Sequence, residues 1–138
     1  MAVETAEFQF STRGDGDVVD FTGEVQGMVE EIGATSGQTL AFVRGSTAAI
    51  STMEFEPGGV HDLREMLERL IPARGEYEHN RLNHDTNSHA HQRATLIGPS
   101  ETVPIVDGRL ALGTWQQLVL LDFDDRPRER TVVVQVTY

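Results

Sequence analysis

Strand-forming sequence at both ends of the chain is the feature that most restricts the fold. Apolar and polar residues alternate in EFQFST (7–12), and the valine-rich RTVVVQVTY (130–138) also favours a strand. Successive side chains of a β-strand point to opposite faces of a sheet, so the alternation predicts a strand with one buried face. Both ends of the chain are therefore expected to lie in a β-sheet that needs a covering layer.

Three further stretches also favour strands. TLAFVRG (39–45) and AAISTMEFE (48–56) flank a small-residue corner, and VPIV (103–106) ends at an Asp107-Gly108 pair. An Asp-Gly pair after an apolar run is typical of a tight hairpin turn. The chain is therefore expected to return as a second hairpin strand in RLALGTWQQLVLLDFD (109–124).

Helical periodicity is clearest in VHDLREMLERLIP (60–72), where apolar residues recur every three or four positions and Pro72 ends the run. A second helix is expected over 23–35, with Thr22 as its N-cap. A third, over SHAHQRATLIG (88–98), is one of two alternatives for that segment. Strands at both ends, with two or three covering helices between them, predict the α+β class with an antiparallel or mixed sheet.

Length and charge limit the class of protein further. A chain of 138 residues is long enough for one domain with one core, so residues 1–138 are expected to form a single domain. It carries 22 acidic residues against 11 basic ones, all of them arginine, and a net charge of −11. Such a surface repels phosphate backbones, which argues against nucleic-acid binding. The acidity is typical of proteins from salt-loving organisms.

Cysteine and long apolar runs are both missing from the sequence. Without cysteine, disulfides and thiolate metal sites are excluded. No apolar run has the length that a bilayer requires, so no membrane association is expected. The N-terminal residues are acidic and do not resemble a signal peptide, so a cytoplasmic location is expected.

Four of the five histidines lie in YEHNRLNHDTNSHAH (77–91), which is either a metal site or a polar surface loop. Spacing singles out His79, His89 and His91, because three neutral imidazoles with an open fourth position are the usual ligands of a catalytic zinc ion. The expected cofactor is therefore a divalent metal ion, zinc, with magnesium as the alternative. Asp85 suits a role behind the ligands, where it would orient an imidazole through its second nitrogen.

The local structure of this segment decides which histidines can act together. On a strand, His89 and His91 face the same side and can share an ion. On a helix that begins at Asp85 or Asn87, the two side chains point about 200° apart, and His91 is then the better placed ligand.

Two further segments are candidate anion sites. RGSTAA (44–49) offers Ser46 and Thr47 hydroxyls beside a glycine, which suits phosphate, but its composition favours the alternative of a tight turn between strands. DDRPRER (124–130) holds three arginines that could bind phosphate bidentately. The alternative is a charged turn in which these arginines pair with the neighbouring acids.

Two single residues complete the candidates. Glu54 lies near the end of a predicted strand and is a candidate for a buried carboxylate able to act as a general base, and the pattern alone does not rank it against Glu56. Trp115, the only tryptophan, lies in a predicted strand and is expected in the core.

Longer stretches of the chain resemble a known family. They are GDGDVVD (14–20), RGSTAAISTMEFEPG (44–58), DTNSHAH (85–91) and DGRLALGTWQ (107–116) with RPRER (126–130). Together they resemble the YjbQ-type family, also called the secondary thiamine-phosphate synthase family, over nearly the whole chain. Where the family commonly has Asp-Gly-Asn, this chain has Asp85-Thr86-Asn87, and the loss of glycine is expected to restrict the backbone there.

This resemblance implies an α+β fold assembled as a homotrimer, with thiamine-phosphate synthase activity. That reaction joins a hydroxymethylpyrimidine pyrophosphate to a thiazole phosphate and releases pyrophosphate. It also implies a metal at the histidine cluster and a phosphate-binding region. By motif position, the implied site residues are His79, His89 and His91 for the metal, Asp85, Asn87 and Glu54 nearby, Gly45, Ser46 and Thr47 for a phosphate, and Arg126 and Arg128 in the arginine turn.

Three functions are consistent with these residues. The first is a metal-binding transferase of the thiamine-phosphate synthase type, acting on a small phosphorylated molecule. The second is a metal-dependent hydrolase of a small phosphorylated or acyl substrate, with Glu54 as the general base. The third is a non-catalytic trimer that binds a metal or a ligand.

Overall fold

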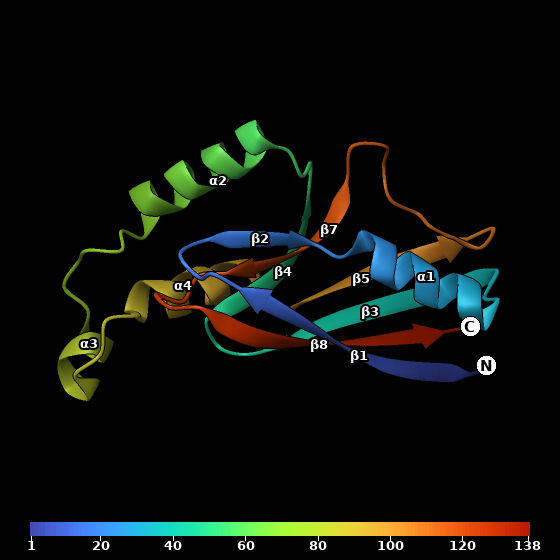
Figure 1. Ribbon diagram of the computed structural model, residues 1–138, viewed down its shortest axis with the longest axis horizontal. Coiled ribbons are helices and arrows are strands. Elements are labelled where there is room, and N and C mark those ends of the chain that lie inside the picture. Colours follow the sequence, from blue (N-terminus) through green and yellow to red (C-terminus); the bar gives the residue numbers. More distant parts are fainter.

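The computed structural model describes all 138 residues, and its eight strands form two sheets in which every pairing is antiparallel (Figure 1). The predicted α+β class is confirmed. The larger sheet has the order β1 (Val3–Thr12), β8 (Arg128–Thr137), β3 (Ser36–Arg44), β5 (Ser100–Val106), β6 (Arg109–Leu110). The smaller sheet has the order β2 (Asp17–Asp20), β7 (Gln117–Asp122), β4 (Ala48–Met53).

The two ends of the chain lie side by side at one edge of the larger sheet (Figure 1). Strands β1 and β8 pair without interruption from Val3 opposite Thr137 to Thr12 opposite Arg128. One step further out, the Ala2 amide donates to the Tyr138 carbonyl at 2.7 Å and the Tyr138 amide donates back at 3.0 Å. The strand-forming sequences at the two ends of the chain thus form two neighbouring strands.

Strand β7 explains how the two sheets share one interior. Leu118 and Leu120 face the core between the sheets, whereas Val119 and Leu121 face a second core on the other side. All four side chains are at most 1% exposed. A strand with both faces covered needs consecutive apolar residues rather than alternation, which is why this stretch reads as an unbroken apolar run.

The chain has four helices, one or two more than the sequence predicts. They are α1 (Thr22–Ile32), α2 (Pro57–Leu70), α3 (Glu78–Asn83) and α4 (Ser88–Ile97). Val25 and Val29 of α1 pack into the core between the sheets. Ala90 and Ala94 of α4, with Leu67 of α2, cover the outer face of the smaller sheet. None of the helices combines the length and the apolar character that a membrane crossing requires.

The predicted N-cap of the first helix is wrong. Phe21 occupies that position, and Thr22 is already helical. The Thr22 hydroxyl instead donates to the Asp20 carboxylate at 2.7 Å and accepts the Leu118 amide at 2.9 Å. The helix ends before residue 35, because Gly33 adopts a left-handed conformation with φ of 76°.

The hairpin at Asp107-Gly108 is confirmed, with φ values of 49° and 78° at the two turn residues. Its second strand is much shorter than expected, because β6 ends at Leu110 and the chain crosses to the smaller sheet before β7 begins. Trp115 lies in this crossing segment and is 73% exposed, so its expected place in the core is wrong.

Candidate functional site

The histidine-rich segment folds into α3 and α4, which meet at a sharp corner. Asn80 closes this corner, since its side-chain oxygen accepts the Ser88 amide at 3.0 Å and its carbonyl accepts the Asp85 amide at 3.1 Å. His84 terminates α3 in a left-handed conformation, with φ of 52°, and is exposed. The helical alternative for 88–98 is therefore confirmed.

The corner brings His79 and His91 together. Their ring centroids are 4.7 Å apart, with the ring planes inclined at 60°. His79 Nε2 lies 3.1 Å from Asn87 Oδ1 and 3.6 Å from Asp85 Oδ2. Both His79 and Asp85 are about one-third exposed, so this cluster is open to solvent.

His89 lies apart from this pair. It follows the first residue of α4, and two positions along a helix turn a side chain by about 200°. Its side chain is 5% exposed and its Nδ1 atom is buried without a hydrogen-bond partner. Burial lowers the pKa of His89 and the Arg93 guanidinium lowers it further, so the imidazole is neutral at pH 7.

The donor atoms at the corner match a divalent metal in chemical type. Two imidazoles and the Asp85 carboxylate are common zinc ligands, and the Asn87 oxygen is within hydrogen-bonding distance of His79. No three histidine or acidic side chains converge on a single point, because His79 Nε2 is directed at Asn87. Metal binding at this corner would therefore require His79 or Asp85 to change rotamer.

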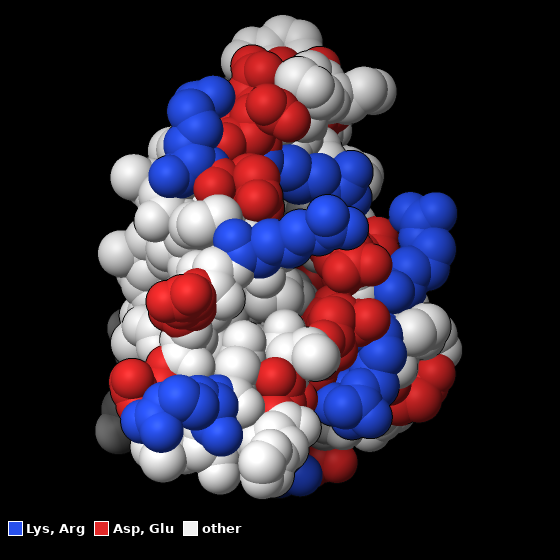
Figure 2. Space-filling view, turned by 90° about the vertical axis from the view of Figure 1, so that its left-hand side faces the viewer, with Lys and Arg blue, Asp and Glu red and all other residues white.

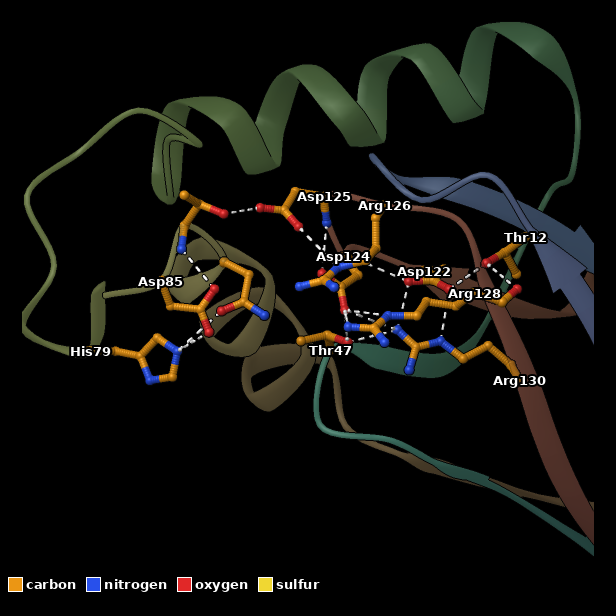
Figure 3. A network of polar contacts seen from close by, with 12 residues as sticks. Thr12, Thr47, His79, Asp85, Asp122, Asp124, Asp125, Arg126, Arg128 and Arg130 are labelled. Carbon is orange, nitrogen blue, oxygen red and sulfur yellow. Dashed lines mark hydrogen bonds and ion pairs between the residues drawn. The ribbon is translucent and has the colours of Figure 1, made fainter. Parts of the chain in front are cut away.

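A buried network of aspartates and arginines lies beside the corner (Figure 3). It joins the end of β7 to the start of β8 and includes the residue before β4. Its members are Thr12, Thr47, Asp122, Asp124, Arg128 and Arg130.

Asp122 and Arg130 form the inner ion pair of this network. Arg130 Nε and Nη2 donate to the two carboxylate oxygens of Asp122, each at 2.7 Å. Asp122 is fully buried and Arg130 is 7% exposed. The Thr12 hydroxyl donates to the same carboxylate at 2.5 Å. Two parallel hydrogen bonds between the guanidinium and the carboxylate compensate for the hydration that both charges lose on burial.

Asp124 and Arg128 form the outer ion pair. Burial would raise the pKa of Asp124, but hydrogen bonds from the Asp125 amide, the Arg128 guanidinium and the Thr47 hydroxyl outweigh it and lower that pKa from 3.8 to about 2. Arg128 Nε lies 2.9 Å from Asp124 Oδ2. Thr47 connects the two pairs, because its hydroxyl also accepts from Arg130 Nη2 at 2.6 Å.

Thr86 joins the network to the histidine corner. Its hydroxyl donates to the Asp125 carboxylate, which belongs to the loop between β7 and β8 (Figure 3). The backbone at Thr86 does not adopt a positive φ, so threonine meets no left-handed strain at this position. The residue that departs from the family pattern therefore makes the contact between the two clusters.

The turn at residues 45–47 packs against the network. Gly45 has φ of 152°, and a Cβ atom there would lie 2.7 Å from Arg130 Nη1. Thr47 is buried with its hydroxyl already engaged, whereas Ser46 is exposed. This geometry matches the tight-turn alternative, and it leaves Ser46 as the hydroxyl that faces solvent.

The arginine turn matches the alternative in which its arginines pair with the neighbouring acids. Arg128 and Arg130 bind network aspartates, and Arg126 Nε lies 4.0 Å from Asp125 Oδ1. The Arg126 side chain is nevertheless 59% exposed and that of Arg128 is 37% exposed. Arginine and acidic side chains alternate closely over the end of the molecule that carries α3 and α4 (Figure 2).

Glu54 lies away from both clusters. It follows the last residue of β4, whereas Thr47 precedes the first, so the length of that strand separates them by roughly 20 Å. Its side chain is exposed, so the expectation of a buried carboxylate is wrong. Within one chain, Glu54 does not reach the His79–His91 pair.

The sequence analysis missed Thr12 and Asp122, and it did not pair Arg130 with Asp122. A signal for that pairing exists in DFDDRPRER, where Asp-x-Asp and Arg-x-Arg repeat at the spacing of one strand face. Side chains two apart on a strand project together, so this spacing predicts two acids facing two arginines. Thr12 gives no comparable signal, because its partner Asp122 is 110 residues away.

A family model described as UPF0047 protein YjbQ-like matches residues 6–138 of the chain. A UPF0047 protein of Archaeoglobus fulgidus is 39% identical over 94% of this chain and 98% of its own length. Another, of Methanothermobacter thermautotrophicus, is 38% identical over 99% of this chain and 93% of its own length.

Solved structures show the same fold. A YbjQ-like protein of unknown function from Sulfolobus solfataricus has a TM-score of 0.92 and 33% identity, over 98% of this chain and 96% of that chain. The hypothetical protein APE1520 from Aeropyrum pernix has a TM-score of 0.89 and 36% identity, over 97% of this chain and 98% of that chain. Sequence and structure thus agree over nearly the whole length, and the chain belongs to the UPF0047 family of YjbQ-like proteins.

Proposed function

We propose that the chain is a transferase of the thiamine-phosphate synthase type, with its reaction centre between the histidine corner and the arginine turn. The observation that supports this proposal most directly is the Thr86–Asp125 contact. It holds a pair of imidazoles beside a loop that presents partly exposed guanidinium groups. Few other places in a chain of net charge −11 offer a phosphorylated substrate such a setting.

In this proposal, the arginines stabilise pyrophosphate as it leaves the pyrimidine. Negative charge grows on the leaving oxygens, so fixed cations lower the barrier more than a nucleophile would. Asp124 orients Arg128, and the low pKa of Asp124 keeps that carboxylate ionised at neutral pH. Arg126 is more exposed and is free to reach the leaving group. Ser46, whose hydroxyl faces solvent, is placed to contact a phosphate oxygen.

The histidine corner has the second role. His79 and His91, with Asp85 beside them, would hold a divalent ion. Such an ion, when bound, supplies positive charge to pyrophosphate oxygens. A hydrolase with Glu54 as general base has less support, because Glu54 lies at the opposite end of β4. That base would have to come from another copy of the chain.

Arg126→Ala is expected to lower kcat for thiamine phosphate formation by about 10²-fold, because it removes one cationic donor to the leaving pyrophosphate. Purified protein would be incubated with hydroxymethylpyrimidine pyrophosphate and thiazole phosphate, and product would be measured by chromatography. Arg109→Ala is the matched control, since Arg109 is an exposed arginine on the β5–β6 hairpin. Equal activity of the Arg126 variant and the wild type would refute the assignment.

His91→Ala is expected to abolish stoichiometric zinc binding, whereas His89→Ala is expected to retain it. The reason is that His91 contacts His79, while His89 points to the other side of α4. Elemental analysis after zinc loading and dialysis would measure the content of each variant. Loss of zinc in the His89 variant alone would reverse the ligand assignment.

A homotrimer is part of the same proposal. The outer face of the larger sheet exposes Leu40 and Phe42, at 36% and 43%, and exposed apolar side chains of this kind favour contact with another copy. Light scattering is expected to give a mass of three chains, and a Leu40→Glu/Phe42→Glu variant is expected to give a lower mass. Leu70→Glu, at an exposed position of α2, is the control. A monomeric wild type would contradict the assembly.

A further inference from the structure

A cavity of about 370 Å³ lies between α2 and the turn that joins β1 to β2. The residues that matter to its chemistry are Arg13, Asp17, Val18, Phe55, Val60 and Arg64. Thr12, which precedes Arg13, lies on the side of the buried network opposite His79 (Figure 3), so the cavity is distinct from the histidine corner. Small-molecule sites have volumes of about 300–1,000 Å³ and combine apolar walls with a few polar groups.

Arg64 supplies the unused polar group of this cavity. Its Nε donates to the Gly16 carbonyl at 2.9 Å, which fixes the plane of the guanidinium. Arg64 is exposed and takes part in none of the ion pairs of the protein, and its two terminal amino groups have no hydrogen-bond partner within the protein. A guanidinium held at Nε with two free amino groups is prepared to bind an oxoanion.

The acids that face the cavity already have donors of their own. Asp17 accepts the Arg13 amide at 2.9 Å and pairs with the Arg13 guanidinium at 3.3 Å. Glu56 caps α2 by accepting the amides of Gly58 and Gly59. Arg13 makes one guanidinium contact to Asp17 and its side chain is 86% exposed, whereas the Arg64 guanidinium is fixed at Nε by the Gly16 carbonyl.

The apolar wall determines the rest of the ligand. Phe55 is 41% exposed, and Val18 and Val60 are half-buried beside it. We propose that this cavity binds a small organic acid, with its carboxylate on Arg64 and its apolar body against Phe55 and Val60. A carboxylate brings one negative charge to Arg64, whereas a phosphate monoester would bring close to two beside Asp17 and Glu56, which also line the cavity.

Benzoate is the probe, with benzyl alcohol as its uncharged analogue and phenyl phosphate as the competing oxoanion. Titration of ¹⁵N-labelled full-length protein with benzoate is expected to give saturable shifts at the amides of Gly16, Val18, Phe55 and Val60. Benzyl alcohol is expected to give none. Phenyl phosphate is expected to bind more weakly, and tighter binding of phenyl phosphate would overturn the choice of a carboxylate.

Arg64→Ala is expected to weaken benzoate binding at least about 10-fold, because a charge-assisted hydrogen bond contributes that much affinity. Arg69→Ala is the matched control, as it removes the same charge from α2 outside the cavity. Val60→Trp provides a second variant that fills the cavity and keeps the contact between Arg64 and Gly16. Absence of saturable shifts, or wild-type affinity in both cavity variants, would refute the site. The proposed transferase activity is independent of either result.

Discussion

Replacing Arg130 by alanine is expected to lower the free energy of unfolding by about 3–5 kcal/mol. Arg130 holds both oxygens of Asp122, which is fully buried. Without the guanidinium, a carboxylate remains in the interior with only the Thr12 hydroxyl and the Asp124 amide to stabilise its charge. Urea unfolding at pH 7, followed by circular dichroism, would measure the difference.

Arg109→Ala is the control for this measurement, since Arg109 is exposed and forms no ion pair. It is expected to change stability by less than about 0.5 kcal/mol. A double variant without Arg130 and Asp122 is expected to lose less than the sum of the single losses, because neither charge is left unpaired. If Arg130→Ala fails to fold, Arg130→Lys is measured in its place. Its free energy of unfolding is expected to lie between that of the wild type and that expected for the alanine variant. A loss below about 1 kcal/mol in either variant would contradict the proposed importance of the pair.

Asp124 is expected to make the protein sensitive to acid below pH 4. Its pKa is about 2 in the folded protein and 3.8 when unperturbed, so the unfolded chain takes up the proton first as pH falls. The stabilisation is fully present above pH 3.8 and is lost as pH falls through 2. The difference corresponds to roughly 2 kcal/mol.

Asp124→Asn removes this contribution, so its stability is expected to fall less steeply than that of the wild type between pH 4 and pH 2. Urea unfolding at several pH values would give both slopes. Asp62→Asn, at an exposed position on α2, is the control and is expected to follow the wild type. Parallel slopes for the wild type and the Asp124 variant would show that other groups control acid unfolding.

The parts of the fold that could be predicted from the sequence are those where burial leaves a periodic pattern. Strand β1 has one buried face, so its apolar and polar residues alternate. The Asp107-Gly108 turn needs two positive φ values, which few other residue pairs adopt easily. Helix α3 escaped prediction because its six residues are too short for a helical period to appear. Trp115 was misplaced because its segment leaves the sheet through a turn that no local pattern marks.

The candidate site could also be predicted only in part from the sequence. Spacing located the histidine segment, but it could not show that the α3–α4 corner pairs His79 with His91 and leaves His89 apart. The arginine turn was recognised, and the pairing of Arg130 with Asp122 was not, because that pairing depends on how the chain passes from β7 in the smaller sheet to β8 in the larger one. Contacts between distant segments, such as Thr12 with Asp122, leave no trace in local sequence.

The pairing of Ala2 with Tyr138 has a mechanical consequence. A force that pulls these two residues apart acts across the β1–β8 ladder, along the direction of its hydrogen bonds. The hydrogen bonds nearest the ends then carry the whole force, and they break before the next ones along the ladder are stretched. The sheet would therefore open at low force from the ends of the chain. The same adjacency means that a short linker could join the two ends, and new ends could be cut at an exposed loop.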